Sequence, residues 1–148
     1  METPVLKLEH ADARGEIYSI SLPGDKELML LYSKKGSLRG GHAHAVNEIV
    51  LLLTGKIKYH IKKDRESQEY TSDMDADKAT HHFQAGNILH GLAFHPKGEY
   101  HMGEFLEDSW LIEFKLNAGK EEWKNDVDYA PWRERVKANA SSPESTVR

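Results

Sequence analysis

Residues 36 to 55 read GSLRGGHAHAVNEIVLLLTG, and this stretch carries the strongest signal in the chain. Its second half, Val46–Leu53, is an almost continuous apolar run, which is typical of a β-strand covered on both faces. His42 and His44 lie two positions apart, so on an extended strand both imidazoles leave from the same face. Glu48 has the same parity, and its carboxylate points the same way if the strand continues through it.

These three side chains predict a metal site. Two neutral imidazoles and one carboxylate form a mixed nitrogen and oxygen donor set that suits one divalent ion of Fe, Mn, Ni or Zn. Glu48 stands among apolar residues, where a buried carboxylate needs a cation or a hydrogen-bond donor to remain charged. From the residue frequencies of this chain, the spacing would arise by chance on the order of a few times in ten thousand.

The rest of the chain reads as short strands separated by turn residues, which favours an all-β barrel or sandwich. Two polar segments, Ser33–Gly41 and Asp64–Lys78, are expected to be loops. In Lys56–Lys63, alternation turns Tyr59 inward and His60 toward water. The other expected strands are Val5–Glu9, Glu16–Leu22, Leu28–Tyr32, Thr80–Gln84, Ile88–Phe94, Tyr100–Leu106 and Ser109–Leu116.

The length of 148 residues fits one domain. We expect residues 1–116 to form the barrel and residues 140–148, which are small and polar, to form a flexible tail. Between them, residues 117–139 carry Trp123, Tyr129 and Trp132. Three large aromatic side chains predict that this segment packs on the barrel or on a neighbouring subunit, with a short helix around residues 132–138.

Composition excludes several classes of protein. The net charge is −4 and the basic residues form no block, so the electrostatic signature of a nucleic-acid-binding protein is missing. There is no cysteine, which excludes disulfides, zinc–thiolate sites and thiol nucleophiles. The longest apolar stretch, Ile49–Leu53, is far shorter than the ~20 residues of a membrane helix. A cytoplasmic location is the default prediction.

The spacing of the first metal motif resembles that of the cupins, a superfamily of small β-barrels. The segment Pro96-Lys97-Gly98-Glu99-Tyr100-His101 is similar to their second motif, Pro-x-Gly-x-x-His. The resemblance implies a single-domain jelly-roll β-barrel in which His101 is a fourth metal ligand, with His95 as the alternative. It also implies a homodimer formed through the N-terminal strands.

Four further residues are candidates for contact with a substrate or for acid–base catalysis: Arg39, Tyr59, His82 and His90. Arg39 immediately precedes the ligand segment, and Tyr59 faces inward by parity. One side chain of the His81–His82 pair must face inward, and His90 shares a face with apolar residues. For each of them, packing in the core or exposure to solvent is the alternative interpretation.

Three functions follow from this site. The first is a metal-dependent enzyme that acts on a small polar organic substrate; with Fe it would resemble the cupin dioxygenases, and with Mn, Zn or Ni the isomerases and decarboxylases of that family. The second is a metal-free enzyme, because residues 38–44 look like the Arg-Gly-x-His-x-His segment of the sugar-nucleotide ketoisomerases, which are also cupins. The third is a non-catalytic barrel that binds sugars or other small molecules.

Overall fold

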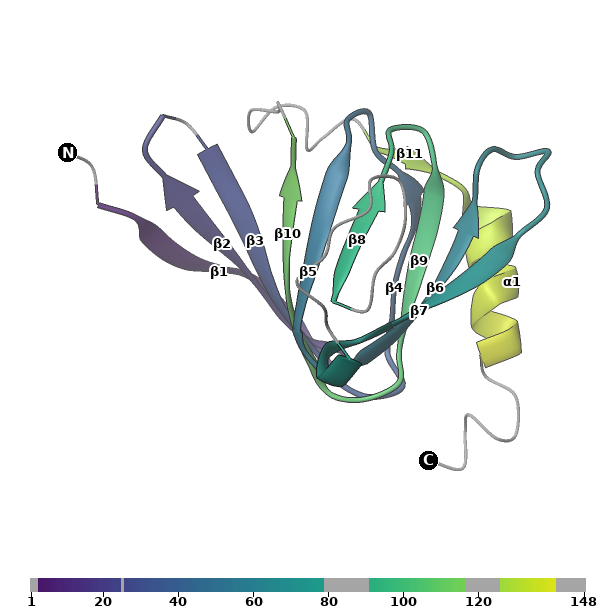
Figure 1. Ribbon diagram of the computed structural model, residues 1–148, viewed down its shortest axis with the longest axis horizontal. Helices are drawn as coiled ribbons and strands as arrows, with labels where there is room; N and C mark the ends of the chain where they lie inside the picture. Colours follow the sequence, from purple (N-terminus) through teal and green to yellow (C-terminus); the bar gives the residue numbers. More distant parts are fainter. Residues whose placement is uncertain (1–2, 25, 79–90, 117–125, 141–148) are drawn as a thin grey trace.

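Two antiparallel sheets make up the protein, as seen in a computed structural model that describes residues 3–24, 26–78, 91–116 and 126–140 (Figure 1). The large sheet has the strand order β1-β2-β3-β10-β5-β8, and the small sheet has the order β11-β4-β9-β6-β7. From β3 to β10 most connections cross from one sheet to the other. This alternation is the jelly-roll arrangement that the sequence predicts.

The strands of the large sheet are β1 (Val5–Asp12), β2 (Gly15–Leu22), β3 (Lys26–Ser33), β10 (Ser109–Lys115), β5 (Glu48–Thr54) and β8 (Leu92–His95). Those of the small sheet are β11 (Val127–Asp128), β4 (Leu38–Ala43), β9 (Tyr100–Phe105), β6 (Lys56–Lys62) and β7 (Tyr70–Asp75). A short 3-10 turn, η1 (Ala76–Lys78), and a helix, α1 (Ala130–Ala140), complete the fold. The expected strand at residues 80–84 and the first part of that at residues 88–94 lie outside the described residues.

The loop predicted for Asp64–Lys78 is wrong in its second half, where residues 70–75 form β7. This strand lies at the edge of the small sheet, and Met74 is its only buried residue. Its acidic residues pair with the basic residues of β6, since Asp75 and Asp73 lie opposite Lys56 and Lys58. Cross-strand charge pairing therefore replaces the apolar alternation by which strands are usually recognised.

The loop predicted for Ser33–Gly41 is also wrong, because β4 begins at Leu38. Its glycines allow a bulge between Gly40 and His42, where both Gly40 and Gly41 take positive φ. A Cβ atom on Gly40 would lie 2.8 Å from the carbonyl oxygen of His101, and one on Gly41 would lie 2.7 Å from the Arg133 side chain. These glycines therefore let β4 approach both β9 and helix α1.

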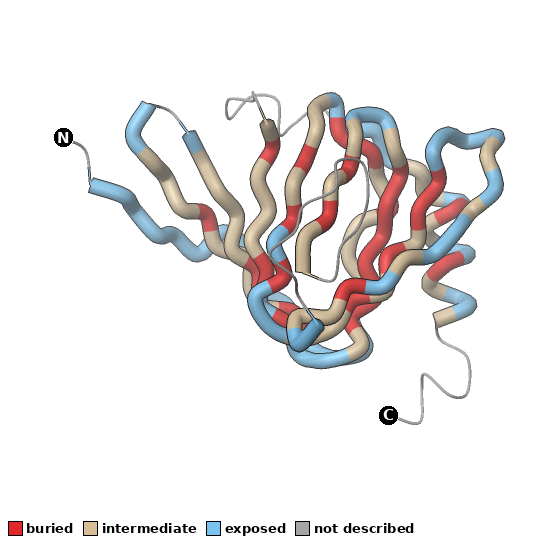
Figure 2. The backbone as a smooth tube through the Cα atoms, viewed as in Figure 1, coloured by how far each residue is buried: buried red, intermediate tan, exposed pale blue. Residues whose placement is uncertain are grey.

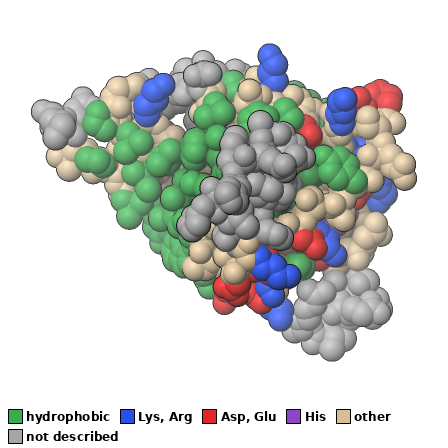
Figure 3. Space-filling model, in the orientation of Figure 1, with side chains coloured by type: hydrophobic (Ala, Val, Ile, Leu, Met, Phe, Trp, Pro, Cys, Tyr) green, Lys and Arg blue, Asp and Glu red, His purple; other side chains and the backbone are tan. Residues whose placement is uncertain are grey.

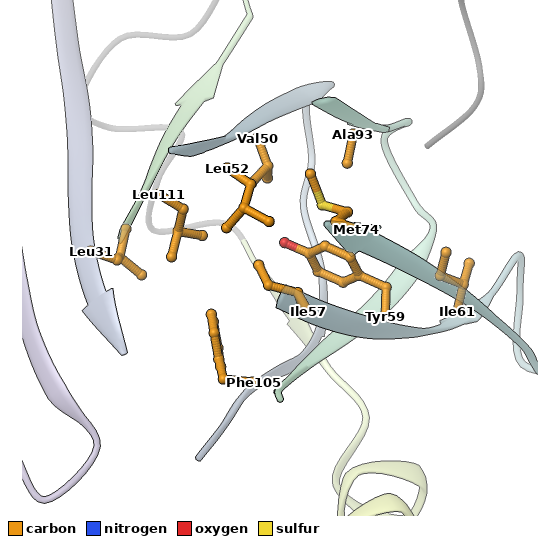
Figure 4. Packing of buried hydrophobic residues seen from close by; sticks show 10 residues of the cluster. All are labelled: Leu31, Val50, Leu52, Ile57, Tyr59, Ile61, Met74, Ala93, Phe105 and Leu111. Carbon is orange, nitrogen blue, oxygen red and sulfur yellow. The ribbon is translucent and has the colours of Figure 1, made fainter. Parts of the chain in front are cut away.

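The core lies between the sheets and is formed by side chains from both (Figure 4). Tyr59 is only 4% exposed there, which confirms its predicted inward orientation. Burial is concentrated in the small sheet and the adjoining strands of the large one, whereas β1 is exposed along its length (Figure 2). The members of this cluster are Leu31, Val50, Leu52, Ile57, Tyr59, Ile61, Met74, Ala93, Phe105 and Leu111.

Helix α1 covers the outer face of the small sheet. Trp132 and Val136 are buried against Ala43, Tyr100 and Met102, so this helix packs on the small sheet. The short helix predicted for residues 132–138 lies within α1, while Trp123 and residues 141–148 lie outside the described part of the chain. In that described part, no helix has the length and apolarity needed to span a membrane.

The predicted solvent exposure of His60 is wrong. Its side chain is only 14% exposed, because the carboxylates of Glu69 and Glu104 enclose it on the outer face of β6. Its two ring nitrogens lie 3.3 Å from Glu69 Oε1 and 3.1 Å from Glu104 Oε2. His60 does point away from the interior, as predicted, and this position is consistent with its exclusion from the metal site.

Candidate metal site

Two cross-strand pairs, one from each sheet, form the centre of the site. In the small sheet, His42 of β4 lies opposite His101 of β9. In the large sheet, Glu48 of β5 lies opposite His95 of β8. His44 belongs to the connection between β4 and β5, just after β4 ends at Ala43. The structure therefore brings together the four predicted ligands and also the alternative, His95.

One continuous strand does not carry the three residues, so the condition under which parity would align Glu48 with the two histidines is not met. β4 of the small sheet ends at Ala43, just after His42, and β5 of the large sheet begins at Glu48, with a bend between the two strands. The side chains still converge because the chain crosses between the facing sheets at this point. The spacing of the motif is thus set by the length of this crossing rather than by strand parity.

The distances between donor atoms suit a single ion. His44 Nε2 lies 3.0 Å from Glu48 Oε2, and His101 Nε2 lies 3.6 Å from Glu48 Oε1. Donors bonded at about 2.1 Å to one ion lie about 3 Å apart at right angles and about 4.2 Å apart on opposite sides. Two triads have donor atoms within 4.8 Å of one another: His42, His44 and His101, and Glu48, His95 and His101.

Several buried polar atoms of the site have no hydrogen-bond partner among the described residues: His44 Nε2, Glu48 Oε2 and both ring nitrogens of His95. His44 Nε2 and Glu48 Oε2 are close, but their geometry is not that of a hydrogen bond. An unpaired buried polar atom costs roughly 1–3 kcal/mol. A divalent cation between them would satisfy these atoms, so the residues fit a metal ion.

The protonation states of His42 and His101 also suit metal binding, whereas at His44 an ion has to displace a proton. Burial, together with the neighbouring histidines, lowers the pKa of His42 and holds the pKa of His101 well below its usual range. Both rings are therefore neutral and able to donate a lone pair near pH 7. Burial also lowers the pKa of His44, but the carboxylates of Asp126 and Glu48 outweigh that effect and raise it to about 9.

Residues behind the candidate ligands hold two of their rings in place. Asp126 Oδ1 lies 2.7 Å from His44 Nδ1 and 3.3 Å from Lys115 Nζ. The backbone carbonyl of Glu99 lies 3.4 Å from His101 Nδ1. Carboxylate or carbonyl acceptors on Nδ1 leave Nε2 for a metal, which is the usual arrangement around ligand histidines. Asp126 has no recognisable signal in the sequence, since it lies almost eighty residues from the motif.

A cavity of about 320 Å³ adjoins the site and is lined by Arg39, His42, Tyr59, His101 and Glu113, among other residues. Arg39 donates from Nε to Ser33 Oγ at 2.7 Å. Burial lowers the pKa of this guanidinium, and no ion pair involves it among the described residues. Burial raises the pKa of Tyr59 well above its usual value, so the phenol keeps its proton.

Glu113 is a site residue that the sequence analysis missed. It lines the cavity from β10, and burial, together with the charge of Glu48, raises its pKa to about 8. It shares a face with the buried Leu111, whereas Trp110 on the opposite face is 37% exposed. Hydrophobicity alone gives no reason to turn a glutamate inward and a tryptophan outward. Of the other candidates, His82 and His90 lie outside the described residues.

Two facing sheets in jelly-roll order with a histidine–carboxylate cluster between them define a β-protein with a candidate metal centre. The sequence matches no protein-family model and no curated protein. Solved structures do match: the capsular polysaccharide assembling protein CapF from Staphylococcus aureus has a TM-score of 0.64 at 18% identity over 86% of this chain. CapF with the inhibitor 3-isopropenyl-tropolone gives 0.64 at 19% identity, also over 86% of the chain.

The oxalate decarboxylase of Lactobacillus farciminis, in its formate complex, has a TM-score of 0.56 at 17% identity over 97% of this chain. The chain spans 34%, 35% and 40% of the lengths of these three chains. CapF and the oxalate decarboxylases are cupins, and the protein has the cupin fold. The fold implied by the two sequence motifs is thus confirmed.

Proposed function

We propose that the protein is a metal-dependent enzyme that binds one divalent ion through His42, His44, Glu48 and His101. The observation that supports this most strongly is the set of buried donor atoms that converge without hydrogen-bond partners. A metal-free ketoisomerase has no use for them, because its histidines act as acid and base. The ion, when bound, supplies Lewis-acid polarisation of a carbonyl or activation of O₂.

The substrate proposed is a small polar organic molecule that carries an oxygen anion or a carbonyl group. The cavity beside His42 and His101, of about 320 Å³, has room for a small organic molecule. The guanidinium of Arg39 attracts negative charge on the substrate, and the protonated phenol of Tyr59 donates a hydrogen bond. CapF binds a tropolone and oxalate decarboxylase binds formate, both of which present oxygen atoms.

Glu113 is the residue best placed to exchange a proton with this substrate. Its raised pKa, about 8, keeps the carboxyl protonated near neutral pH, while still allowing it to release the proton. It faces the same cavity as Arg39, so a substrate oriented by the guanidinium also lies near the carboxyl. An isomerase or decarboxylase needs such a proton donor, whereas a dioxygenase does not.

Metal analysis of protein purified without a histidine tag tests the proposal. We expect one Fe, Mn, Ni or Zn ion per chain, and its loss in the double variant His42→Ala/His44→Ala. A folded wild-type protein that takes up none of these ions contradicts the proposal. Activity is then measured on carbonyl, diketone, catechol and carboxylate substrates with and without O₂. Turnover that requires O₂ indicates a dioxygenase, and turnover without it indicates an isomerase or lyase.

We also infer that the protein forms a homodimer through the outer face of the large sheet. Hydrophobic side chains gather over this sheet (Figure 3), and Leu53 and Trp110 are 50% and 37% exposed. The neighbouring strand β1 lies at the sheet edge, and Leu6 and Leu8 are more than half exposed. A second copy would cover both features. Sedimentation of the wild type and of Leu53→Glu should give a dimer and a monomer respectively.

A further inference from the structure

A second guanidinium, that of Arg14, lines the cavity together with Arg39. Arg14 lies in the turn between β1 and β2, and its Nη1 donates to the backbone carbonyl of Leu38 at 3.3 Å. Arg39 is the next residue of β4 and donates to Ser33 Oγ. Because Ser33 lies opposite Gly15, the neighbour of Arg14, both arginines lie at the same end of the cavity.

The two cations share one close counterion among the described residues. Asp12 Oδ2 accepts hydrogen bonds from Nε and Nη2 of Arg14 at 3.0 and 2.6 Å, whereas no ion pair involves Arg39. Burial, followed by the charge of Arg14, lowers the pKa of Arg39. Asp12, Glu16 and Glu113 oppose this effect without forming an ion pair with the guanidinium. A bound anion would relieve the repulsion between the two arginines.

Both guanidiniums keep N–H donors that a ligand can use. A guanidinium carries five such donors. Arg14 uses three of them, two on Asp12 and one on a backbone carbonyl of β4. Arg39 uses two, on Ser33 Oγ and, at 3.5 Å, on the backbone carbonyl of Tyr32. Donors therefore remain on the terminal nitrogens of both side chains, and paired anionic oxygens are the acceptors that match them.

The two arginines lie at the opposite end of β4 from the candidate metal ligands. Leu38 begins this strand and His42 lies four residues later, which is roughly 12 Å along an extended chain. The lining of the cavity runs from Arg14 to His42 and His101. A ligand that fills the cavity therefore meets the ion at one end and the two guanidiniums at the other.

We propose that Arg14 and Arg39 together bind a carboxylate of the substrate at the end of the cavity away from the ion. Asp12 already offsets one of the two positive charges, so the single charge of a carboxylate balances the pair, whereas a phosphate group brings up to two. This inference rests on the proposed function and narrows its substrate to acids with two functional groups. One group binds the ion and the other, a carboxylate, lies several bonds away, so a one- or two-carbon acid is too short.

Binding of two five-carbon acids to the Zn-loaded protein tests this inference. Glutarate has a carboxylate at each end and pentanoate at one end only, so they differ in the group that the two arginines would bind. We expect calorimetric titration of the wild type to give at least tenfold tighter binding of glutarate. This preference should fall below threefold in Arg14→Gln and in Arg39→Gln.

Two further variants separate the charge of Arg14 from its contacts in the turn. Arg14→Lys keeps the positive charge and should retain more of the preference for glutarate than Arg14→Gln does. Arg135→Gln is the matched control and should behave as the wild type, because Arg135 is an exposed residue of α1. The affinity for Zn should be the same in all of these variants, since none of them removes a candidate metal ligand.

The outcomes distinguish this inference from the proposed function. Equal binding of glutarate and pentanoate by the Zn-loaded wild type, or an unchanged preference in Arg14→Gln, would overturn the role of Arg14 and leave the proposed function intact. Tighter binding of 4-phosphonobutyrate than of glutarate would overturn the choice of a carboxylate. A wild-type protein that takes up no metal would overturn both proposals.

Discussion

His44 and His60 each lie between two carboxylates, yet the two environments differ. His60, on the outer face of the small sheet, makes hydrogen bonds with both Glu69 and Glu104. His44, between the sheets, is hydrogen-bonded to Asp126 alone, and its Nε2 faces Glu48 Oε2 at 3.0 Å without hydrogen-bond geometry. The comparison indicates that satisfied polar atoms, rather than the proximity of a carboxylate, distinguish a structural histidine from a candidate metal ligand.

The largest expected difference between these two histidines is in metal binding. His44→Ala should lose Zn affinity by at least 100-fold, because it removes one of the proposed donors. His60→Ala should retain the wild-type affinity, since its partners lie outside the site. Isothermal titration with Zn measures both. Equal losses in the two variants would contradict the division between ligand and structural histidine.

Removal of the metal should lower the free energy of unfolding by about as much as the loss of His44 lowers the free energy of metal binding. An ion present at one hundred times its dissociation constant stabilises the folded state by about 2.7 kcal/mol. For a chain of this length, that corresponds to a fall of roughly 5–11 °C in the melting temperature on addition of a chelator. Scanning calorimetry with and without EDTA gives the value. His44→Ala serves as the control and should show no such shift.

His60→Ala should destabilise the fold by about 1–3 kcal/mol, because it leaves two largely enclosed carboxylates facing each other without their donor. Glu69 also accepts a hydrogen bond from Trp132 Nε1 at 2.8 Å, so the variant weakens the attachment of helix α1 as well. Denaturant unfolding monitored by tryptophan fluorescence measures the change. A loss of stability together with a loss of bound metal would show that the two regions are coupled.

The smallest effect concerns the pH dependence of stability. Glu113 has its pKa raised to about 8 in the folded protein, whereas in the unfolded chain the value is close to 4.5. Between these values the folded state binds more protons than the unfolded state, so the stability of the metal-free protein should fall as pH rises. Glu113→Gln should remove about 1–2 kcal/mol of this decline between pH 6.5 and pH 8. Unfolding curves that slope equally in both proteins would contradict the raised pKa.

Sequence patterns predicted most of the strands, because apolar alternation survives wherever one face of a strand meets the core. They failed for β7, whose acidic residues pair with lysines of β6 instead of packing in the core. They also failed for β4, where glycine replaces the apolar residues to allow the bulge and the close approach of α1. In both cases the stabilising contacts come from a different strand or helix, so a short stretch of the sequence does not contain them.

By itself, the sequence determined the fold class and the local set His42, His44 and Glu48, because these residues are close in the chain and their spacing is informative. The tertiary structure decided what surrounds them. The register of β8 against β5 sets His95 opposite Glu48. The orientation of β10 in the large sheet points Glu113 into the cavity. Asp126 reaches His44 from a segment that follows the sheets. Each of these contacts depends on long-range strand pairing or chain crossing, which no local pattern in the sequence records.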